Sequence, residues 1–266
     1  MSRIEWTQKT WNPITGCTKV SPGCANCYAE VMARRLHAMP APGYERGFEL
    51  TVHPDRLAAP LQRRKPTMYF VNSMSDSFHK NVPDAFLDRI FDVIRDTPRH
   101  TYQVLTKRAR RLPRYFAQRS CSDNVWLGVS VEDRRRLARI EPLRQTKAAV
   151  RFLSVEPLLE DLGDIDLTDI SWVIVGGESG PKARPMRQEW ALGVLEQCQT
   201  ADVPFFFKQW GTFGPDGVRR SKKANGRMLA GRLWEQYPVP ASAPGRAACA
   251  PRALEDELLP SSNAPR

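Results

Sequence analysis

VRFLSV at residues 150–155 and WVIVGG at residues 172–177 are the stretches that decide the fold class of this chain. Both are short, nearly continuous apolar runs, which is typical of strands buried on both faces of a parallel sheet. Comparable runs occur at residues 68–72, 101–105, 125–130 and 204–208, and a first strand is expected within residues 4–11. The sequence therefore predicts about seven parallel strands.

Amphipathic segments separate several of these runs. In residues 82–98 apolar side chains recur every four residues from Phe86 to Ile94, and a proline stands near each end. Residues 133–145 and 187–201 are expected to form further helices, the first of them bent or ended at its proline. Alternation of strands and helices predicts an α/β fold, and we expect a complete or partial parallel (β/α) TIM-like barrel.

Composition sets the expected domain and compartment. The chain has 266 residues, of which 41% are hydrophobic, enough for a sizeable core. Pro, Ala and Ser dominate residues 237–266, so we expect a barrel domain over residues 1–236 followed by a disordered tail. No uninterrupted apolar stretch approaches membrane-spanning length, and the first residues lack the apolar core of a signal peptide. A cytoplasmic protein with no membrane partner is therefore expected.

Three cysteines, Cys17, Cys24 and Cys27, lie close together in GCTKVSPGCANCY at residues 16–28. In a reducing compartment, clustered thiols indicate a metal site rather than a disulfide. The C-x-x-C spacing of Cys24 and Cys27 brings two thiolates onto adjacent coordination positions. A closed site usually takes four ligands, so three leave one position open for substrate chemistry.

Two readings without enzymatic activity stay open at this point. A histidine that completes a Cys3His set would make a zinc-bound nucleic-acid-binding module. The four histidines are scattered, and the nearest, His37, lies ten residues beyond Cys27. A degenerate barrel that has lost its chemistry would instead serve as a scaffold.

The basic residues do not decide what kind of partner the protein binds. The formal net charge is +11, and arginines cluster at residues 108–114 and 134–139. This balance suits a polyanionic partner such as nucleic acid or a nucleotide, but solvated helix faces produce the same pattern. Four tryptophans are candidates either for stacking on bases or for the core: Trp6, Trp11, Trp126 and Trp210.

Polar residues follow nearly every apolar run. The carboxyl ends of parallel barrel strands meet at one face, where active sites are built, so these residues are expected to surround one pocket. The cysteine loop follows the first expected strand and therefore belongs to the same face. The candidate ligand-binding residues are Asp76, Ser130, Glu132, Ser154, Glu156, Gly176, Gly177, Glu178 and Lys208.

The sequence resembles two groupings of proteins. A three-cysteine loop after the first strand of a parallel barrel is similar to the radical S-adenosylmethionine (SAM) superfamily, although this chain has C-x6-C-x2-C spacing in place of C-x3-C-x2-C, and Asn26 stands where an aromatic residue is usual. A closer resemblance is to the phage-encoded family named after gene products thirty-seven and sixty-eight. It rests on the strings WNPITGC, NSMSDSFH, LTKR, NVWLGVSVE, RFLSVEPLL, WVIVGGESGP, PFFFKQWG and LAGRLWEQYP.

The resemblance implies a radical SAM enzyme of phage or prophage origin. The three cysteines would hold three irons of a [4Fe–4S] cluster, and the fourth iron would bind SAM. Reduction by an electron donor such as flavodoxin or ferredoxin would cleave SAM, and the resulting radical would abstract hydrogen from a nucleic acid or nucleotide that is modified or repaired. Of the strand-end candidates, carboxylates would bind the SAM amine or ribose, Lys107 or Lys208 its carboxylate, and Gly176 and Gly177 would allow close backbone approach.

Overall fold

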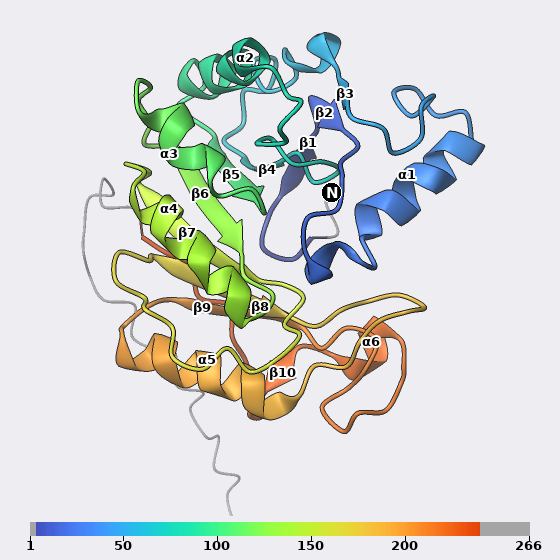
Figure 1. Ribbon diagram of the computed structural model, residues 1–266, viewed down its shortest axis with the longest axis vertical. Helices are drawn as coiled ribbons and strands as arrows, with labels where there is room; N and C mark the ends of the chain where they lie inside the picture. The colour runs from blue at the N-terminus through green and yellow to red at the C-terminus, as the bar shows by residue number, and fades with distance from the viewer. Residues whose placement is uncertain (1–3, 240–266) are drawn as a thin grey trace, which may run out of the picture.

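The computed structural model describes residues 4–239 and contains a seven-stranded, entirely parallel sheet (Figure 1). Its order is β1-β4-β5-β6-β7-β8-β9, so each strand of the sheet lies beside the next one along the chain. The sheet therefore confirms the predicted α/β class and strand number. The strands are β1 (Lys9–Trp11), β4 (Met68–Val71), β5 (Thr101–Thr106), β6 (Val125–Ser130), β7 (Val150–Val155), β8 (Trp172–Gly176) and β9 (Phe205–Gln209).

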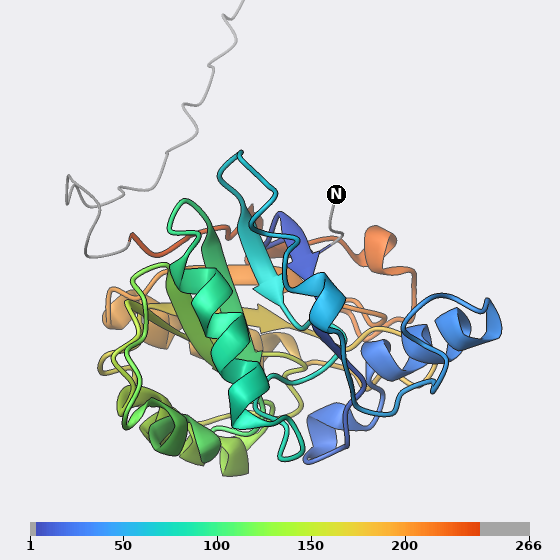
Figure 2. The same ribbon diagram turned by 90° about the horizontal axis from the view of Figure 1, so that it is seen from above.

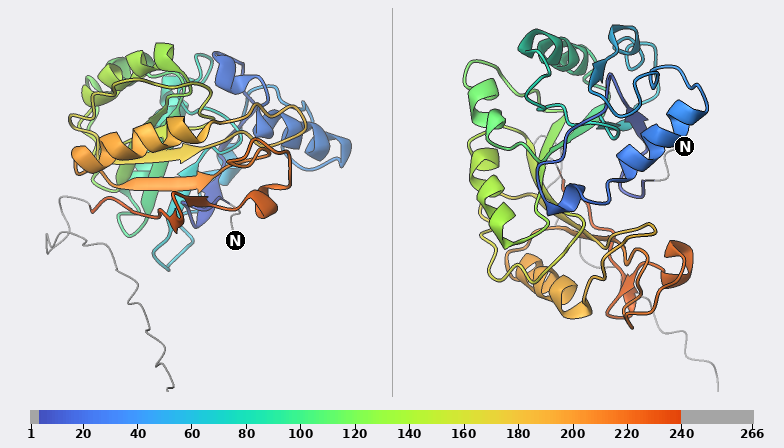
Figure 3. Two further views of the ribbon diagram at one scale, coloured as in Figure 1. Left: turned by 90° about the horizontal axis from the view of Figure 1, so that it is seen from below. Right: turned by 45° about the vertical axis from the view of Figure 1, so that its right-hand side comes forward.

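Helices cover the outer side of a curled sheet (Figures 1 and 3). Within the described residues β1 and β9 are not paired with each other, so the fold is a partial barrel rather than a closed one. The curl keeps the carboxyl ends of the strands around a common space. The helices are α1 (Tyr28–Ala38), α2 (Asp84–Arg95), α3 (Arg111–Phe116), α4 (Ile140–Arg144), α5 (Gln188–Thr200) and α6 (Lys222–Asn225).

Smaller elements complete the described part of the chain. The short 3-10 helices found there are η1 (Pro22–Cys24), η2 (Pro54–Arg56) and η3 (Arg134–Arg139). Two short antiparallel pairs lie outside the main sheet, β2 (Ile14–Thr15) with β3 (Thr51–Val52) and β10 (Met228–Leu229) with β11 (Arg232–Leu233). Figure 2 shows α1 and the loops around it beside the sheet, at the end of the molecule opposite α5.

The predicted helices form with different regularity. Over residues 82–98 the apolar stripe is buried along α2, and Pro83 caps the helix start. The segment 187–201 forms α5 as expected. The segment 133–145 instead divides into η3 and the five-residue α4, because its run of arginines offers few apolar side chains to pack. Pro142 is tolerated inside α4 because it lies in the first turn, where its missing N–H has no helical partner to lose.

Two apolar layers pack on opposite sides of the sheet. The larger lies between the sheet and the outer helices, and the second, rich in aromatic rings, includes Trp6, Phe70, Phe152 and Trp172. Trp6 lies edge-on to Phe70, with ring centroids 4.7 Å apart. Gly128 makes room for this layer, since a Cβ there would lie 2.5 Å from the Phe152 ring. Aromatic side chains thus fill the inner side of the barrel.

Two further expectations concern the C-terminal tail and membrane-spanning segments. Of the tail predicted to begin at residue 237, residues 240–266 lie outside the described residues, so the domain boundary stays a prediction. Tyr237 itself packs on the sheet, with its ring centroid 5.2 Å from that of Trp172. Within residues 4–239 no helix has the length and apolar character needed to cross a membrane.

Candidate active site

A cavity of about 390 Å³ lies at the carboxyl ends of the strands. The three clustered cysteines line it together with seven of the nine strand-end candidates. Strand register explains part of this convergence, because Ser130 at the end of β6 lies directly beside Ser154 near the end of β7. The seven lining candidates are Asp76, Ser130, Ser154, Glu156, Gly177, Glu178 and Lys208.

Backbone contacts hold the cysteine loop at the cavity. Gly16 has a φ of +77°, and a Cβ there would lie 2.1 Å from the Glu49 carbonyl oxygen, so only glycine fits this crossing. The amide of Cys17 donates to the Phe48 carbonyl at 3.3 Å. Cys24 ends η1, and Cys27 is the N-cap of α1, so a tight turn and a helix start set the other two thiols.

All three thiols are free and partly exposed. Burial, reinforced by the Asp76 carboxylate and Cys24, raises the pKa of the Cys17 thiol to about 11, so a thiolate there needs a compensating cation. Within the described part of the chain no three His, Cys, Asp or Glu side chains converge to hold a single metal ion. A [4Fe–4S] cluster binds each thiolate through a different iron, so its ligands need not meet at one point. Three cysteine thiolates are a donor set that fits such a cluster.

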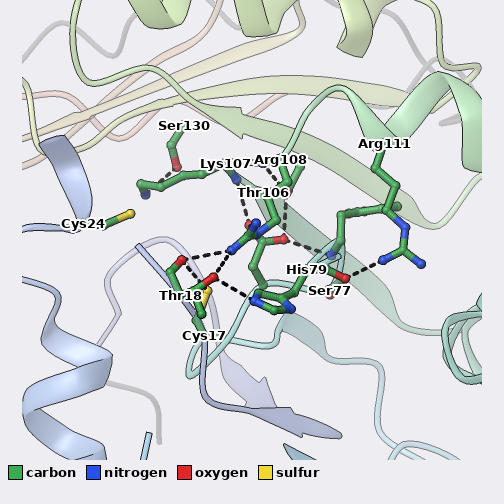
Figure 4. Close-up of polar contacts among 12 residues, drawn as sticks. Cys17, Thr18, Cys24, Ser77, His79, Thr106, Lys107, Arg108, Arg111 and Ser130 are labelled. Carbon is green, nitrogen blue, oxygen red and sulfur yellow. Dashed lines mark hydrogen bonds and ion pairs between the residues drawn. The ribbon is translucent and has the colours of Figure 1, made fainter. Parts of the chain in front are cut away.

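The two lysines considered for anion binding differ in their surroundings. Lys208 Nζ lies 2.9 Å from Glu156 Oε1, so its charge is already neutralised. Lys107 Nζ donates to Ser130 Oγ at 3.0 Å and makes no ion pair with any described carboxylate (Figure 4). Lys107 is therefore the better candidate to receive an anionic group in the cavity.

Glu178 joins the end of β8 to the cysteine loop. Arg184 binds both of its carboxylate oxygens, at 2.7 and 2.9 Å, and Asn26 Nδ2 donates to Oε2 at 3.0 Å. Burial alone raises the pKa of Glu178, but these hydrogen bonds outweigh it and hold the pKa below its usual value. Asn26 thus anchors the cysteine loop to Glu178, beyond the end of β8.

Two candidate residues lie behind the cavity wall instead of in its lining. Glu132 is fully buried, pairs with Arg139 at 2.7 Å and supports the cysteine loop from beneath Gly23. Gly176 is the last residue of β8, and a Cβ there would lie 2.9 Å from Glu156 Oε1, so its glycine makes room for that carboxylate. The structure therefore places these two residues outside the cavity lining, since a strand-end residue can also face the loop that covers the strand.

Asp76 lines the cavity, but its carboxylate is already engaged. It accepts hydrogen bonds from the Phe78 amide at 2.9 Å, the Thr106 hydroxyl at 2.7 Å and the Lys107 amide at 3.0 Å. Phe78 lies in the loop after β4, Thr106 is the last residue of β5, and Lys107 begins the loop after it. Asp76 therefore holds the two loops together at the cavity edge.

Some contacts at the cavity could not be predicted from the sequence. The ion pair of Lys222 with Glu5, at 2.5 Å, joins the two sides of the open barrel at the cavity. Of the four candidate tryptophans, Trp6 lines the cavity and the others do not.

Most arginines of the two clusters pair with carboxylates that stabilise the fold, which favours the structural reading of these clusters. The pairs are Arg108–Asp76, Arg111–Asp84, Arg134–Asp161, Arg136–Asp133 and Arg139–Glu132.

Fold and site together define a partial parallel (β/α) barrel with a three-cysteine loop at a cavity that strand-end polar residues also line. The chain belongs to DUF5131, a family described as proteins of unknown function, whose model matches residues 1–238. This family is of the gene-product thirty-seven/sixty-eight type, in agreement with the resemblance seen in the sequence. No curated protein matches the chain.

Solved structures of spore photoproduct lyase are similar in part. A double mutant with bound AdoMet and dinucleoside spore photoproduct matches with a TM-score of 0.40 and 15% identity over 63% of this chain. A complex with dinucleoside spore photoproduct matches with a TM-score of 0.39 and 13% identity over 70% of this chain. The chain spans 55% and 59% of the lengths of those two structures. Similarity at this level describes a shared portion of the fold and nothing more.

Proposed function

We propose that this protein is a radical SAM enzyme that holds a [4Fe–4S] cluster through Cys17, Cys24 and Cys27. The observation that carries the proposal is the meeting of three free thiols with strand-end polar groups in one cavity. Three protein ligands leave one iron open to a small molecule. When bound and reduced, such a cluster supplies the electron that breaks a carbon–sulfur bond of SAM.

The residues of the cavity divide the binding work. Lys107, which has a positive charge and no carboxylate partner among the described residues, is placed to bind the SAM carboxylate. Ser130 fixes its ammonium group, and the Glu156–Lys208 pair offers an acceptor and a donor to amino and hydroxyl groups. Glu178 keeps the cysteine loop against the barrel.

The substrate we propose is a nucleic acid or nucleotide. Trp6, Phe70 and Leu105 give the cavity an apolar wall suited to a base, and the chain is strongly basic. An electron donor such as flavodoxin or ferredoxin would complete the reaction.

The test is SAM cleavage by anaerobically reconstituted protein. Chemical reduction should release 5′-deoxyadenosine, and the release should rise when the correct DNA or RNA fragment is added. Cys24→Ser should abolish it, whereas Cys121→Ser, which changes a half-buried thiol outside the loop, should not. Equal release by both variants would contradict the ligand set, and a wild-type protein that forms a cluster but never cleaves SAM would contradict the reaction.

A further inference from the structure

The loops after β4 and β5 converge on Thr18, the residue that follows Cys17, and cofactor binding alone does not require this. We propose that Arg108 is a positioning residue for Cys17. In this role the Arg108 guanidinium donates a hydrogen bond to the cluster-bound sulfur of Cys17 and raises the reduction potential of the cluster. This inference rests on the proposed function. It explains why the strings LTKR and NSMSDSFH both reach the cysteine loop.

Arg108 is fastened to the residue that follows Cys17. Its Nη2 donates to the Thr18 carbonyl at 3.0 Å and to the Thr18 hydroxyl at 2.7 Å (Figure 4). Only 14% of the Arg108 side chain is exposed. This partly buried guanidinium holds Thr18 at two atoms and so limits the movement of the backbone next to Cys17.

His79 fixes the same peptide from the other loop. Its Nδ1 accepts from the Asn81 amide at 3.2 Å, so its proton lies on Nε2, which donates to the Thr18 hydroxyl at 2.9 Å. His79 is fully buried. Thr18 thus receives two donors from two separate loops, and the position of Cys17 depends on both.

One N–H donor of the Arg108 guanidinium, Nε, is not used in binding Thr18. The Thr18 carbonyl oxygen that Arg108 binds lies 3.5 Å from the Cys17 sulfur. Arg108 Nε is buried with no hydrogen-bond partner among the described residues. The nearest carboxylate oxygen, Asp76 Oδ2, is 3.9 Å from Nε and already accepts from the Lys107 amide. An unpartnered donor on a buried cation is costly, and a negatively charged sulfur nearby would offset that cost.

The consequence for an iron–sulfur cluster follows from charge. Reduction adds negative charge to the cluster and its sulfur ligands, and N–H donors and cations stabilise that state. Arg108 should therefore make the cluster easier to reduce. Without it, the cluster should still form on three thiols but should demand a stronger reductant.

The experiment compares midpoint potentials of reconstituted variants by redox titration monitored with electron paramagnetic resonance, alongside iron content. Arg108→Gln should bind the cluster at a more negative potential than wild type, and Arg108→Lys should fall between them. Arg110→Gln is the control, because it removes an equal charge from an exposed position of the same segment, and it should match wild type.

The outcomes separate this inference from the proposed function. A wild-type potential in Arg108→Gln would overturn the role of Arg108 while leaving the enzyme proposal intact. If Arg108→Gln takes up no iron, Arg108→Lys decides, and a wild-type potential there overturns the inference. A wild-type protein without a cluster would refute the proposed function itself.

Discussion

Replacing Asp76 by asparagine should lower the stability of the folded protein more than it lowers the affinity for a ligand in the cavity. The carboxylate is 7% exposed and accepts three hydrogen bonds from two loops. An asparagine can keep its oxygen toward Phe78 and Thr106, but its amide then faces the Lys107 N–H, donor against donor. Since a hydrogen bond to a charged group is worth about 1.5–3 kcal/mol, Asp76→Asn should cost about 2–3 kcal/mol.

Alanine at the same position should cost more. It leaves three donors without their acceptor, and we expect a loss of about 3–5 kcal/mol, a large share of the ~5–15 kcal/mol that usually stabilises a domain. Urea unfolding followed by circular dichroism measures both losses. Asp92→Asn is the matched control, because Asp92 is 51% exposed and its ion pair in the described part of the chain is with Arg95. This variant should change stability by less than about 0.5 kcal/mol.

The reasoning would be refuted by an Asp76→Asn protein as stable as wild type. Such a result would mean that the carboxylate is not needed by the two loops. If SAM binding were lost at the same time, Asp76 would be a ligand residue rather than a structural one.

Three further outcomes follow from the site and the core. Lys107→Met should weaken SAM binding by about tenfold to a hundredfold in equilibrium dialysis, because a charged hydrogen bond worth about 1.5–3 kcal/mol is lost; an unchanged affinity would exclude Lys107 as the carboxylate partner. The lowered pKa of Glu178 stabilises the folded protein above the usual pKa of 4.5, and this stability is lost as the pH falls through the pKa of the folded state. On acidification below pH 4.5 the urea midpoint of Glu178→Gln should therefore fall less than that of wild type. Parallel pH profiles of the two proteins would contradict this. Gly128→Ala should cost about 1–3 kcal/mol in thermal unfolding, because its Cβ would overlap the Phe152 ring, and a neutral effect would show that the ring can move away.

The strands and the location of the site follow from the sequence for a local reason. Runs such as VRFLSV and WVIVGG identify buried strands by themselves, and parallel strands place their carboxyl ends on one face. That is enough to bring Ser154 and Glu178 to the same cavity as Cys17. The helical stripe of α2 is equally local, since its spacing alone defines a buried face.

The roles within the site depend on contacts that spacing does not contain. Arg108 reaches Thr18 across 90 positions of the chain, and Asn26 reaches Glu178 across 152. Whether Glu132 faces the cavity or the underside of the cysteine loop depends on how that loop folds back over β6. Strand-end residues can therefore be predicted as a group, while the division between ligand-facing and loop-supporting members requires the three-dimensional path of the loops.

The central claim is that three thiols hold an iron–sulfur cluster, and metal analysis tests it most directly. Anaerobic reconstitution with iron, sulfide and competing zinc should give a brown protein with about four irons and four sulfides per chain. Serine at Cys17, Cys24 or Cys27 should reduce that content sharply, and serine at Cys121 should leave it unchanged. A colourless protein that carries one zinc ion under the same conditions would contradict the account.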